Sequence, residues 1–273
     1  MDKEIKNKLF LAPAAQLDLV KTFECGQCFR WEQDESSVYK GVAHGKALSI
    51  WRDGEGIFCD APESDLSIWR NYLDLETDYD CPAAVFTEPE YLKTCAEYGK
   101  GIRILRQEPW EALCSFIISQ CNNIPRIKQI IGTLCRLYGE KLDDDIYSFP
   151  DARTIAALSE SELAPLRCGY RAPYILSAAR AVCEGSLDFD ALAAMPADDA
   201  FTELKRLQGV GSKVASCFML YGLHRMDSFP IDTWMKKALD RHFPKDYDPA
   251  VLGSFAGLAQ QYIFFYARTN EEW

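Results

Sequence analysis

A glycine-rich turn in the C-terminal half of the chain is the first feature that could support chemistry. Residues 207–217 read Leu-Gln-Gly-Val-Gly-Ser-Lys-Val-Ala-Ser-Cys. Gly209 and Gly211 flank Val210, so the chain can reverse tightly there and present bare backbone amides at the start of the next helix. Such amides suit a phosphodiester, because they donate to phosphate oxygens at the end of the helix where the dipole favours negative charge.

Lys213 and Asp232 are the candidate catalytic residues beside this turn. Lys213 lies in the first turn of the helix, and its amine, once unprotonated, is a nucleophile. Cys217 stands four residues later on the same helical face, where its thiol can influence the amine. Asp232 follows after one helix and a loop and opens another helix, whose dipole favours the ionised carboxylate. Taken singly, the lysine would be a solvated side chain and the aspartate an N-cap.

The secondary structure predicted around these residues changes along the chain from strands to helices. Alternating apolar residues separated by turn residues predict an antiparallel meander with strands near 28–31, 38–42, 47–51 and 57–59. After about residue 81 the apolar period becomes helical, and helices are predicted near 125–138, 110–120, 174–184, 199–207, 212–223, 233–242 and 251–267. The sequence therefore predicts an α+β fold, with a small antiparallel sheet domain (residues 1–82) packed on a mainly helical body (residues 83–273).

The charge distribution bears on the choice of partner. The 273-residue chain has a formal net charge of -11, which by itself argues against nucleic acid, since lysine and arginine supply most affinity for a phosphate backbone. The charges are segregated, however. Residues 60–97 hold ten acidic and two basic side chains, whereas residues 102–137 hold five basic and two acidic ones. A basic face on an acidic body is therefore compatible with the sequence.

Other function classes find little support in the composition. No apolar run reaches the roughly 18 residues of a membrane span, and the N-terminal residues lack the pattern of a secretory signal or transit peptide. We therefore expect a cytoplasmic, prokaryotic protein that works as a monomer. The eleven cysteines are scattered through apolar patterns, and the pair Cys25 and Cys28 has no second pair at zinc spacing. We expect buried thiols and no metal ligands there.

The glycine turn followed by Lys213 and Asp232 resembles the helix-hairpin-helix and Gly/Pro…Asp pattern of a DNA glycosylase superfamily. Within it the chain is most similar to the 8-oxoguanine DNA glycosylases, over roughly residues 17–267. The resemblance implies a TATA-binding-protein-like sheet domain on a helix-hairpin-helix body. It also implies a bifunctional enzyme that excises 8-oxoguanine from double-stranded DNA and then cleaves the strand by β-elimination. Lys213 would form a Schiff base with the sugar, and no cofactor would be needed for catalysis.

The resemblance also assigns base-recognition residues. The segment beginning at Gly26 is similar to the one whose glycine carbonyl faces the flipped base, where it would accept from the N7 hydrogen that guanine lacks. Gln260 and Phe264, four apart on the last helix, are similar to the pair that addresses the Watson–Crick edge and stacks on the base. Cys217 would cover the other face, and Pro230 completes the set. Taken alone, Phe264 would be a core aromatic and Gly26 a turn glycine.

A second group would contact DNA around the gap left by the flipped base. Asn122, Asn123 and Arg126 are similar to the family's asparagine-rich wedge, and Tyr170 and Arg171 to its partner in the opened duplex. Both arginines present forks of donors that could read the unpaired cytosine; the alternative is that they contact only phosphate or solvent. The hairpin amides would bind phosphate, and a structural cation could be shared by the hairpin carbonyls.

Two departures from the family pattern touch selectivity. Cys121 stands where the family begins its run of three asparagines, and Trp234 where eukaryotic enzymes carry histidine. Two alternatives remain open at this point. One is a glycosylase of the same superfamily for an alkylated purine or an oxidised pyrimidine. The other is a module that binds damaged DNA without chemistry, although binding alone would not need Lys213.

Overall fold

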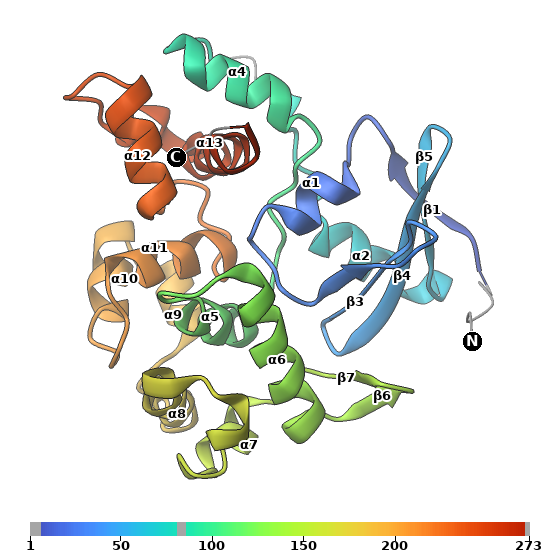
Figure 1. Cartoon of the computed structure of the whole chain (residues 1–273), viewed down its shortest axis with the longest axis vertical. Helices are drawn as coiled ribbons and strands as arrows, with labels where there is room; N and C mark the ends of the chain where they lie inside the picture. The colour runs from blue at the N-terminus through green and yellow to red at the C-terminus, as the bar shows by residue number, and fades with distance from the viewer. Residues whose placement is uncertain (1–6, 81–85, 271–273) are drawn as a thin grey trace.

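The computed structural model describes residues 7–80 and 86–270. An antiparallel sheet with two short helices forms one side of the molecule, and a helical body forms the other (Figure 1). The predicted α+β class is therefore confirmed. The predicted domain boundary, between residues 82 and 83, lies outside the described residues.

The sheet has five strands in the order β1-β5-β4-β3-β2. Their bounds are Leu9–Pro13 (β1), Trp31–Gln33 (β2), Tyr39–Ala43 (β3), Lys46–Asp53 (β4) and Gly56–Asp60 (β5). The predicted meander corresponds to β2–β5, and the β3–β4 turn at His44 and Gly45 has the positive φ angles of a tight hairpin. Strand β1 was not predicted, because its five residues are mostly apolar without alternation and its pairing with β5 is interrupted by an irregularity.

Helices α1 (Leu19–Glu24) and α2 (Leu66–Tyr72) lie between the sheet and the helical body (Figure 1). They enclose an aromatic core in which the Trp31 ring stacks on Phe23 with centroids 4.2 Å apart. The Trp31 indole N–H donates to the Tyr72 hydroxyl at 2.9 Å, so its polar atom is satisfied inside the core. This core fixes the segment that links α1 to β2, which contains Gly26.

The helical body contains the longer elements. They are α4 (Glu90–Gly99), α5 (Pro109–Ile118), α6 (Ile124–Tyr138), the β6–β7 hairpin (Lys141–Asp143 and Ile146–Tyr147), α7 (Ala152–Ala156), α8 (Ala172–Cys183), α9 (Phe189–Ala194), α10 (Ala197–Leu204), α11 (Ser212–Tyr221), α12 (Thr233–His242) and α13 (Ala256–Asn270). The predicted helices are confirmed with shifted ends. The last one begins later than predicted, at Ala256, because Gly253, with φ of 55°, interrupts the 3-10 segment over 249–255 that precedes it.

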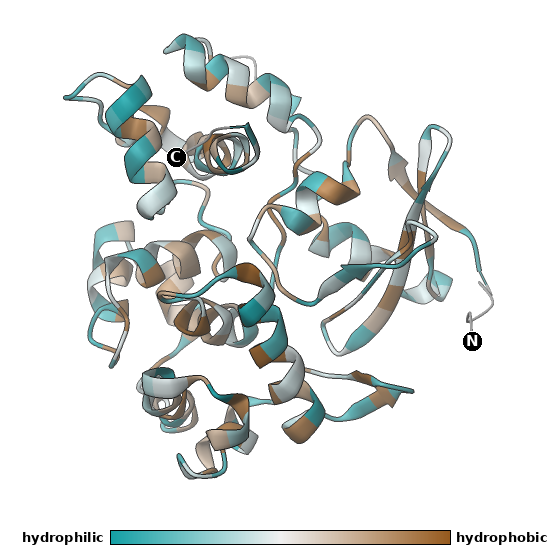
Figure 2. Ribbon diagram, viewed as in Figure 1, coloured by the Kyte–Doolittle hydropathy of each residue, from teal (hydrophilic) through white to brown (hydrophobic). Residues whose placement is uncertain are grey.

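Helix α5 is the centre of the body. Residues 112–118 are all buried, and the helix is mainly brown in the middle of the hydropathy view (Figure 2). It packs against α6, α8 and α11, while α13 packs between α4 and α12. A helix that is apolar on all sides is stable only inside such a body, and α5 thereby fixes the position of α11, which carries Lys213.

A buried ionic cluster around Asp74 joins the sheet domain to the body. The Asp74 carboxylate accepts from Thr77, Tyr79 and Arg106 at 2.7–2.8 Å, and His224 Nε2 lies 3.4 Å from it. Burial raises the pKa of this carboxyl, but the bonds from His224, Tyr79 and Thr77 outweigh burial and hold the pKa well below its ordinary value. His224 belongs to the loop that leads from α11 to Asp232, so this cluster fixes the sheet domain against the part of the body that holds the candidate site.

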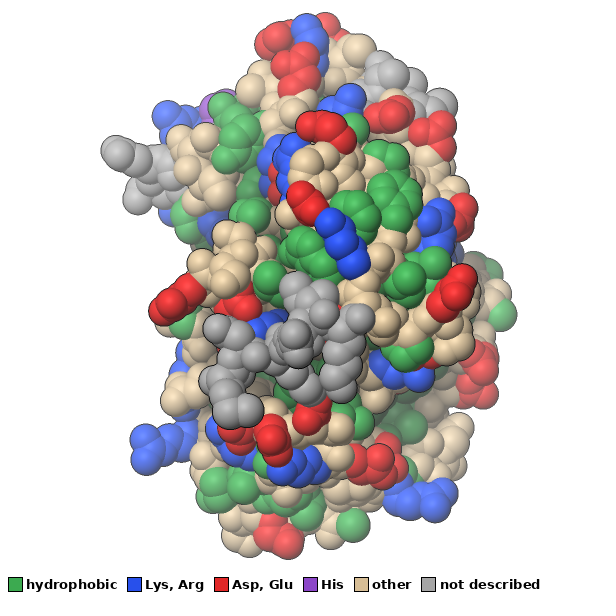
Figure 3. Space-filling model, turned by 90° about the vertical axis from the view of Figure 1, so that its right-hand side faces the viewer, with side chains coloured by type: hydrophobic (Ala, Val, Ile, Leu, Met, Phe, Trp, Pro, Cys, Tyr) green, Lys and Arg blue, Asp and Glu red, His purple; other side chains and the backbone are tan. Residues whose placement is uncertain are grey.

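The outer side of the molecule in Figure 3 carries acidic and basic side chains interspersed with apolar ones. The charge segregation along the sequence does not produce a surface of one sign on this face. Of the helices within residues 7–80 and 86–270, none is both long and apolar enough to cross a membrane.

Candidate active site

The predicted hairpin joins α10 to α11. Gly209 has a φ of 79°, and a Cβ on it would lie 2.1 Å from the Tyr174 ring, so no other residue fits there without rearrangement. Val210 is buried and holds the turn, while Gly211 is the N-cap of α11 with an extended backbone and no side-chain cap. The first amides of α11 therefore have neither an intrahelical acceptor nor a capping side chain, which leaves them available to an anion.

The Lys213 amine is held by a short relay of hydrogen bonds. Its Nζ donates to Ser119 Oγ at 2.9 Å, and Ser119 Oγ donates to the Phe116 carbonyl at 2.8 Å. Nζ also lies 5.5 Å from the centroid of the Phe116 ring. Ser119 was not predicted as a functional residue, because it is 94 positions away from Lys213 and only the packing of α5 on α11 brings the two together.

The charges of Lys213 and Asp232 both affect the thiol of Cys217. Burial raises the pKa of the Cys217 thiol to about 11; Lys213 opposes the shift and Asp232 adds to it. The thiol is therefore protonated at neutral pH and cannot act as a counter-charge for the amine. Lys213 lies in the first turn of α11, one turn before Cys217, and Asp232 is the N-cap of α12.

One carboxylate oxygen of Asp232 caps a helix, and the other has no hydrogen bond among the described residues. Its Oδ1 accepts from the backbone N–H of Met235 at 2.8 Å and caps α12. The aspartate therefore does act as the N-cap that its sequence position alone would suggest. Its Oδ2 accepts no hydrogen bond from the described part of the chain, and no ion pair joins it to Lys213 there. The cap orients the carboxylate without using all of its acceptors.

Gly26 and Phe264, from opposite ends of the chain, meet at the surface between α1 and α13. Gly26 has a φ of 82°, and a Cβ on it would lie 3.3 Å from the Phe264 ring and 3.3 Å from Arg268 Nη1. The Arg268 guanidinium lies 5.6 Å from the Phe264 ring centroid, and its Nη1 has no hydrogen-bond partner among the described residues. Arg268 was not predicted, since nothing in its local sequence distinguishes it from a solvated arginine.

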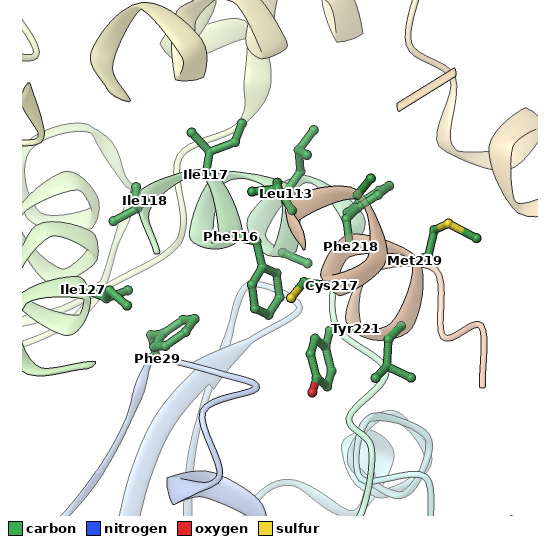
Figure 4. Packing of buried hydrophobic residues seen from close by; sticks show 14 of the residues in the cluster. Phe29, Leu113, Phe116, Ile117, Ile118, Ile127, Cys217, Phe218, Met219 and Tyr221 are labelled. Atoms are coloured by element: carbon green, nitrogen blue, oxygen red, sulfur yellow. The ribbon is translucent and has the colours of Figure 1, made fainter. Parts of the chain in front are cut away.

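An aromatic wall continues from Gly26 toward α11. Figure 4 shows the sulfur of Cys217 next to Phe116 and Tyr221, with Phe29 on the other side of Phe116. The rings of Phe116 and Tyr221 are stacked with centroids 5.2 Å apart, and Phe29 meets Phe116 edge to face at 6.1 Å. The Tyr221 hydroxyl points away from these apolar side chains and lies 3.2 Å from Gln260 Oε1 (Figure 4).

The remaining base-recognition residues are buried beside this wall. Gln260 is 3% exposed, Pro230 is buried two residues before Asp232, and Phe264 is half-buried. The structure thus places Gly26 next to Phe264 of α13 and links Gln260 of α13, through Tyr221, to α11, the helix that carries Lys213 and Cys217.

The pair Cys25 and Cys28 belongs to two separate cores. Cys25 lies in the core of the body and Cys28 in that of the sheet domain, and both thiols are free. Burial raises the pKa of Cys25 to about 12 and that of Cys28 well above its ordinary value. Within the described ranges, no three His, Cys, Asp or Glu side chains come together in a metal-binding group. These thiols are core residues.

The predicted wedge lies at the start of α6. Asn123 is the N-cap of α6 and accepts from the backbone N–H of Arg126, while the Asn122 side chain donates to the Ile118 carbonyl at 3.2 Å. The Arg126 guanidinium donates to Gln129 Oε1 at 2.7 Å and to the Arg167 carbonyl at 3.0 Å. Its donors face protein groups in this structure.

Arg171 is more deeply engaged than Arg126. It is 9% exposed and donates to the carbonyls of Gln120, Cys121 and Cys168. Tyr170, which covers the guanidinium at 4.5 Å from the ring centroid, is 50% exposed. A contact between Arg171 and a base would require these carbonyl bonds to be exchanged.

The two departures from the family pattern lie beside predicted site residues. Cys121 is exposed and has a φ of 47°, a left-handed conformation that asparagine adopts more readily than cysteine. Trp234 is half-buried in the first turn of α12, two residues after Asp232.

Comparisons with known proteins cover almost the whole chain. Residues 9–113 match the 8-oxoguanine DNA glycosylase N-terminal domain, and residues 114–251 match the helix-hairpin-helix-GPD superfamily of base excision DNA repair proteins. The solved 8-oxoguanine glycosylase/lyase of Clostridium acetobutylicum, in complex with double-stranded DNA containing cytosine opposite 8-oxoG, is 33% identical with a TM-score of 0.90, over 97% of this chain and 96% of that chain. A probable N-glycosylase/DNA lyase of Methanothermobacter thermautotrophicus is 27% identical over 94% of this chain and 96% of its own length. An N-glycosylase/DNA lyase of Arabidopsis thaliana is 28% identical over 91% of this chain and 77% of its own length.

Proposed function

Since the chain belongs to the helix-hairpin-helix-GPD superfamily of base excision repair proteins, and within it to the 8-oxoguanine DNA glycosylase/lyase family, we propose that it excises 8-oxoguanine from double-stranded DNA and then cleaves the strand. The observation that carries this proposal is geometric: the packing of α5 on α11 holds the Lys213 amine 2.9 Å from Ser119 Oγ, one helical turn before the buried Cys217. Asp232 keeps one carboxylate oxygen without a hydrogen bond among the described residues, and Gly26 meets the Phe264 ring. A nucleophile, a carboxylate and a base-sized apolar surface are the groups that this reaction needs.

In the proposed complex the lesion is extruded from the duplex and held between Phe264 and Cys217. The backbone carbonyl of Gly26 accepts from the N7 hydrogen of 8-oxoguanine. In guanine the same carbonyl would face the N7 lone pair, which leaves a buried acceptor unpaired at a cost of roughly 1–3 kcal/mol. The glycine allows this approach, because its missing side chain keeps the base path to the carbonyl open.

The chemistry follows from the relay that holds Lys213. The unprotonated amine attacks C1′ of the flipped nucleotide, the N-glycosidic bond breaks, and the base leaves with its electron pair and takes up a proton. The amine then loses its proton, the sugar ring opens, and a Schiff base forms between Nζ and C1′. Asp232 stabilises the positive charge that develops on the sugar. Loss of a C2′ proton from the Schiff base expels the 3′ phosphate and cleaves the strand. Ser119 orients the amine, and the chain supplies every group without a cofactor.

The DNA contacts around this centre are part of the same proposal. The hairpin amides of Gly209, Val210 and Gly211 bind a backbone phosphate, with a cation at the hairpin carbonyls as a further prediction. Tyr170 fills the gap in the stack, supported by Asn122 and Asn123. Arg126 and Arg171 read the cytosine opposite the lesion once their present bonds are exchanged. The prediction of a cytoplasmic, prokaryotic enzyme also stands as a proposal, which cell fractionation would test.

Borohydride trapping tests the proposed function directly. The native protein should form a covalent complex with a duplex containing 8-oxoguanine opposite cytosine, because borohydride reduces the Schiff base to a stable amine. Lys213→Gln should abolish trapping and keep binding. Lys205→Gln, which removes an exposed lysine on the same hairpin motif, is the matched control and should trap normally.

The outcome also separates the alternatives. A native protein that traps only duplexes with an alkylated purine or an oxidised pyrimidine would be a glycosylase for another lesion. A protein that binds the 8-oxoguanine duplex without any trapped species would have no lyase chemistry. Full strand cleavage by Lys213→Gln would assign the nucleophile to another residue.

A further inference from the structure

Three buried polar side chains form a closed group behind the base-recognition surface. The Tyr221 hydroxyl lies 2.5 Å from Gln261 Oε1 and 3.2 Å from Gln260 Oε1, and Gln261 Nε2 donates to the Cys25 carbonyl at 3.0 Å. Tyr221, Gln260 and Gln261 are 4%, 3% and 0% exposed, so their polar atoms are shielded from bulk solvent. Within the described residues, the only hydrogen bond of the Gln260 side chain is the one to Tyr221.

The number of protons in this group determines how Gln260 must be oriented. A tyrosine hydroxyl has one proton, yet it faces two amide oxygens. The Gln261 amide is fixed, because its Nε2 donates to the Cys25 carbonyl and its Oε1 must therefore face the hydroxyl. The proton serves Gln261, which is also the closer acceptor. The Tyr221 oxygen is then left with lone pairs toward Gln260, and a half-turn of the Gln260 amide places its N–H₂ there as a donor.

We propose that Tyr221 and Gln261 are positioning residues that hold the Gln260 amide with its oxygen toward the base pocket, so that the site selects a guanine-type Watson–Crick edge. The inference rests on the proposed function. The N1 atom of 8-oxoguanine carries a hydrogen and donates to that oxygen, whereas N1 of 8-oxoadenine is an acceptor and would face it without a bond. The donor chain runs from Gln260 through Tyr221 and Gln261 to the Cys25 carbonyl.

This chain also couples the two halves of the reading site. Cys25 directly precedes Gly26, so the relay that orients Gln260 from α13 is anchored on the backbone next to the carbonyl that would accept from N7. Burial raises the pKa of Tyr221 well above its ordinary value, which keeps the hydroxyl protonated as a donor across the neutral range. The stack of Tyr221 on Phe116 fixes the ring, so the hydroxyl has little freedom to choose another partner.

Two variants disturb the relay in different ways. Tyr221→Phe removes the hydroxyl and frees the Gln260 amide to adopt either orientation. Gln261→Met keeps the shape of the side chain and removes its oxygen, so the Tyr221 proton turns to Gln260 Oε1 and the N–H₂ of Gln260 turns toward the pocket. Tyr72→Phe, which removes a buried hydroxyl from the sheet core, is the matched control.

The experiment compares single-turnover excision from duplexes with 8-oxoguanine or 8-oxoadenine opposite cytosine. Relative to the native protein, Tyr221→Phe should lower the rate for 8-oxoguanine about tenfold. Gln261→Met should lower the ratio of the 8-oxoguanine rate to the 8-oxoadenine rate further, by roughly one to two orders of magnitude. Tyr72→Phe should keep the native ratio. Affinity for a duplex with an abasic-site analogue, which has no base to read, should be unchanged in all three.

The possible failures are distinguishable. If the native protein excises 8-oxoguanine and both relay variants keep the native ratio, the relay does not orient Gln260 and the inference is wrong. A uniform loss for both bases with an unchanged ratio would show a structural role only, and would also overturn it. If the native protein releases neither base, the proposed function itself fails, and the inference fails with it.

Discussion

The base pocket and the wedge differ in how their polar groups are bonded before DNA binds. Behind the base-recognition residues, the Tyr221 hydroxyl bonds to Gln261 Oε1 and Gln261 Nε2 donates to the Cys25 carbonyl, and these bonds can remain when a base enters. At the wedge and its partner segment, hereafter together the wedge, Arg126 and Arg171 donate to loop carbonyls. Each arginine would have to give up these bonds in order to reach a base. The polar groups behind the base-recognition residues already have their bonding partners, whereas those of the wedge segments would have to exchange theirs.

This difference indicates that the two recognition tasks follow different physics. A set of polar groups whose bonds remain applies its full selectivity to each base that enters, because no reorganisation accompanies binding. The wedge exchanges one set of hydrogen bonds for another, and such an exchange changes the free energy by little per bond. Lesion recognition should therefore be stringent, while recognition of the opposite base should depend on small energy differences.

The largest effect on the excision rate should come from removing the Asp232 carboxylate. Asp232→Asn keeps an oxygen to cap α12 but removes the charge, so we expect the single-turnover excision rate to fall about 10³-fold with unchanged stability. Asp232→Ala removes both, and should in addition lose about 1 kcal/mol of unfolding free energy in urea. Excision by Asp232→Asn within tenfold of the native rate would show that the charge is not used.

The ionic cluster at Asp74 tests whether the pocket depends on the contact between the two domains. Asp74→Asn leaves Arg106 and His224 without their buried carboxylate and should cost about 3 kcal/mol of unfolding free energy at pH 7. Because Gly26 and Gln260 lie on opposite sides of this contact, excision should fall while preference for the opposite base is kept. A variant as stable as the native protein would contradict the role of the cluster.

The lowered pKa of Asp74 predicts how the stability of the native protein changes with pH. The folded pKa of Asp74 lies below its ordinary value of about 3.9, so its contribution is complete above that pH and is lost as the pH falls toward the folded pKa. Urea unfolding of the native protein should therefore show decreasing stability below about pH 4. The difference between native protein and Asp74→Asn should shrink over the same range, and a constant difference would argue against this account.

Local patterns in the sequence identified the candidate catalytic residues, but not the side chains that contact them. Sequence alone could identify the hairpin glycines, Lys213 and Asp232 as candidates. A turn, the first turn of a helix and an N-cap each depend only on residues that are close in sequence. Ser119 and Tyr221 could not be assigned roles in this way. Their contacts come from α5, α11 and α13 packing together, and sequence spacing does not contain that information.

The distinction between local and tertiary information also explains which parts of the sheet and of the wedge could be predicted. Strands β2–β5 alternate and were predicted, whereas β1 lacks alternation and is defined by its pairing with β5. The sequence identified Arg171 as a donor but gave no sign that the carbonyls of Gln120 and Cys121 compete for it. Competing acceptors at the wedge are tertiary features.

The two arginines of the wedge offer a comparison within that region. Arg126→Ala removes a partly exposed side chain and should lower the preference for cytosine over adenine opposite the lesion about tenfold, with little change in stability. Arg171→Ala should lower the preference similarly and also cost about 2 kcal/mol, because buried carbonyls lose their donors. Excision opposite each of the four bases, combined with urea unfolding, measures both. An unchanged preference in both variants would assign the arginines to phosphate or to structure.

The smallest effect should come from Cys121, at the strained start of the wedge. Its φ of 47° is uncommon for a residue with a Cβ, and asparagine tolerates it best because its short amide can bond to the local backbone. Cys121→Asn should therefore raise the unfolding free energy by about 0.5–1 kcal/mol and sharpen cytosine preference by at most a few fold. Cys121→Ala, which removes the thiol without favouring this conformation, is the control and should give no gain. Equal stability of the two variants would mean that the wedge carries no backbone strain, and its readiness to rearrange would then lie in the arginine bonds alone.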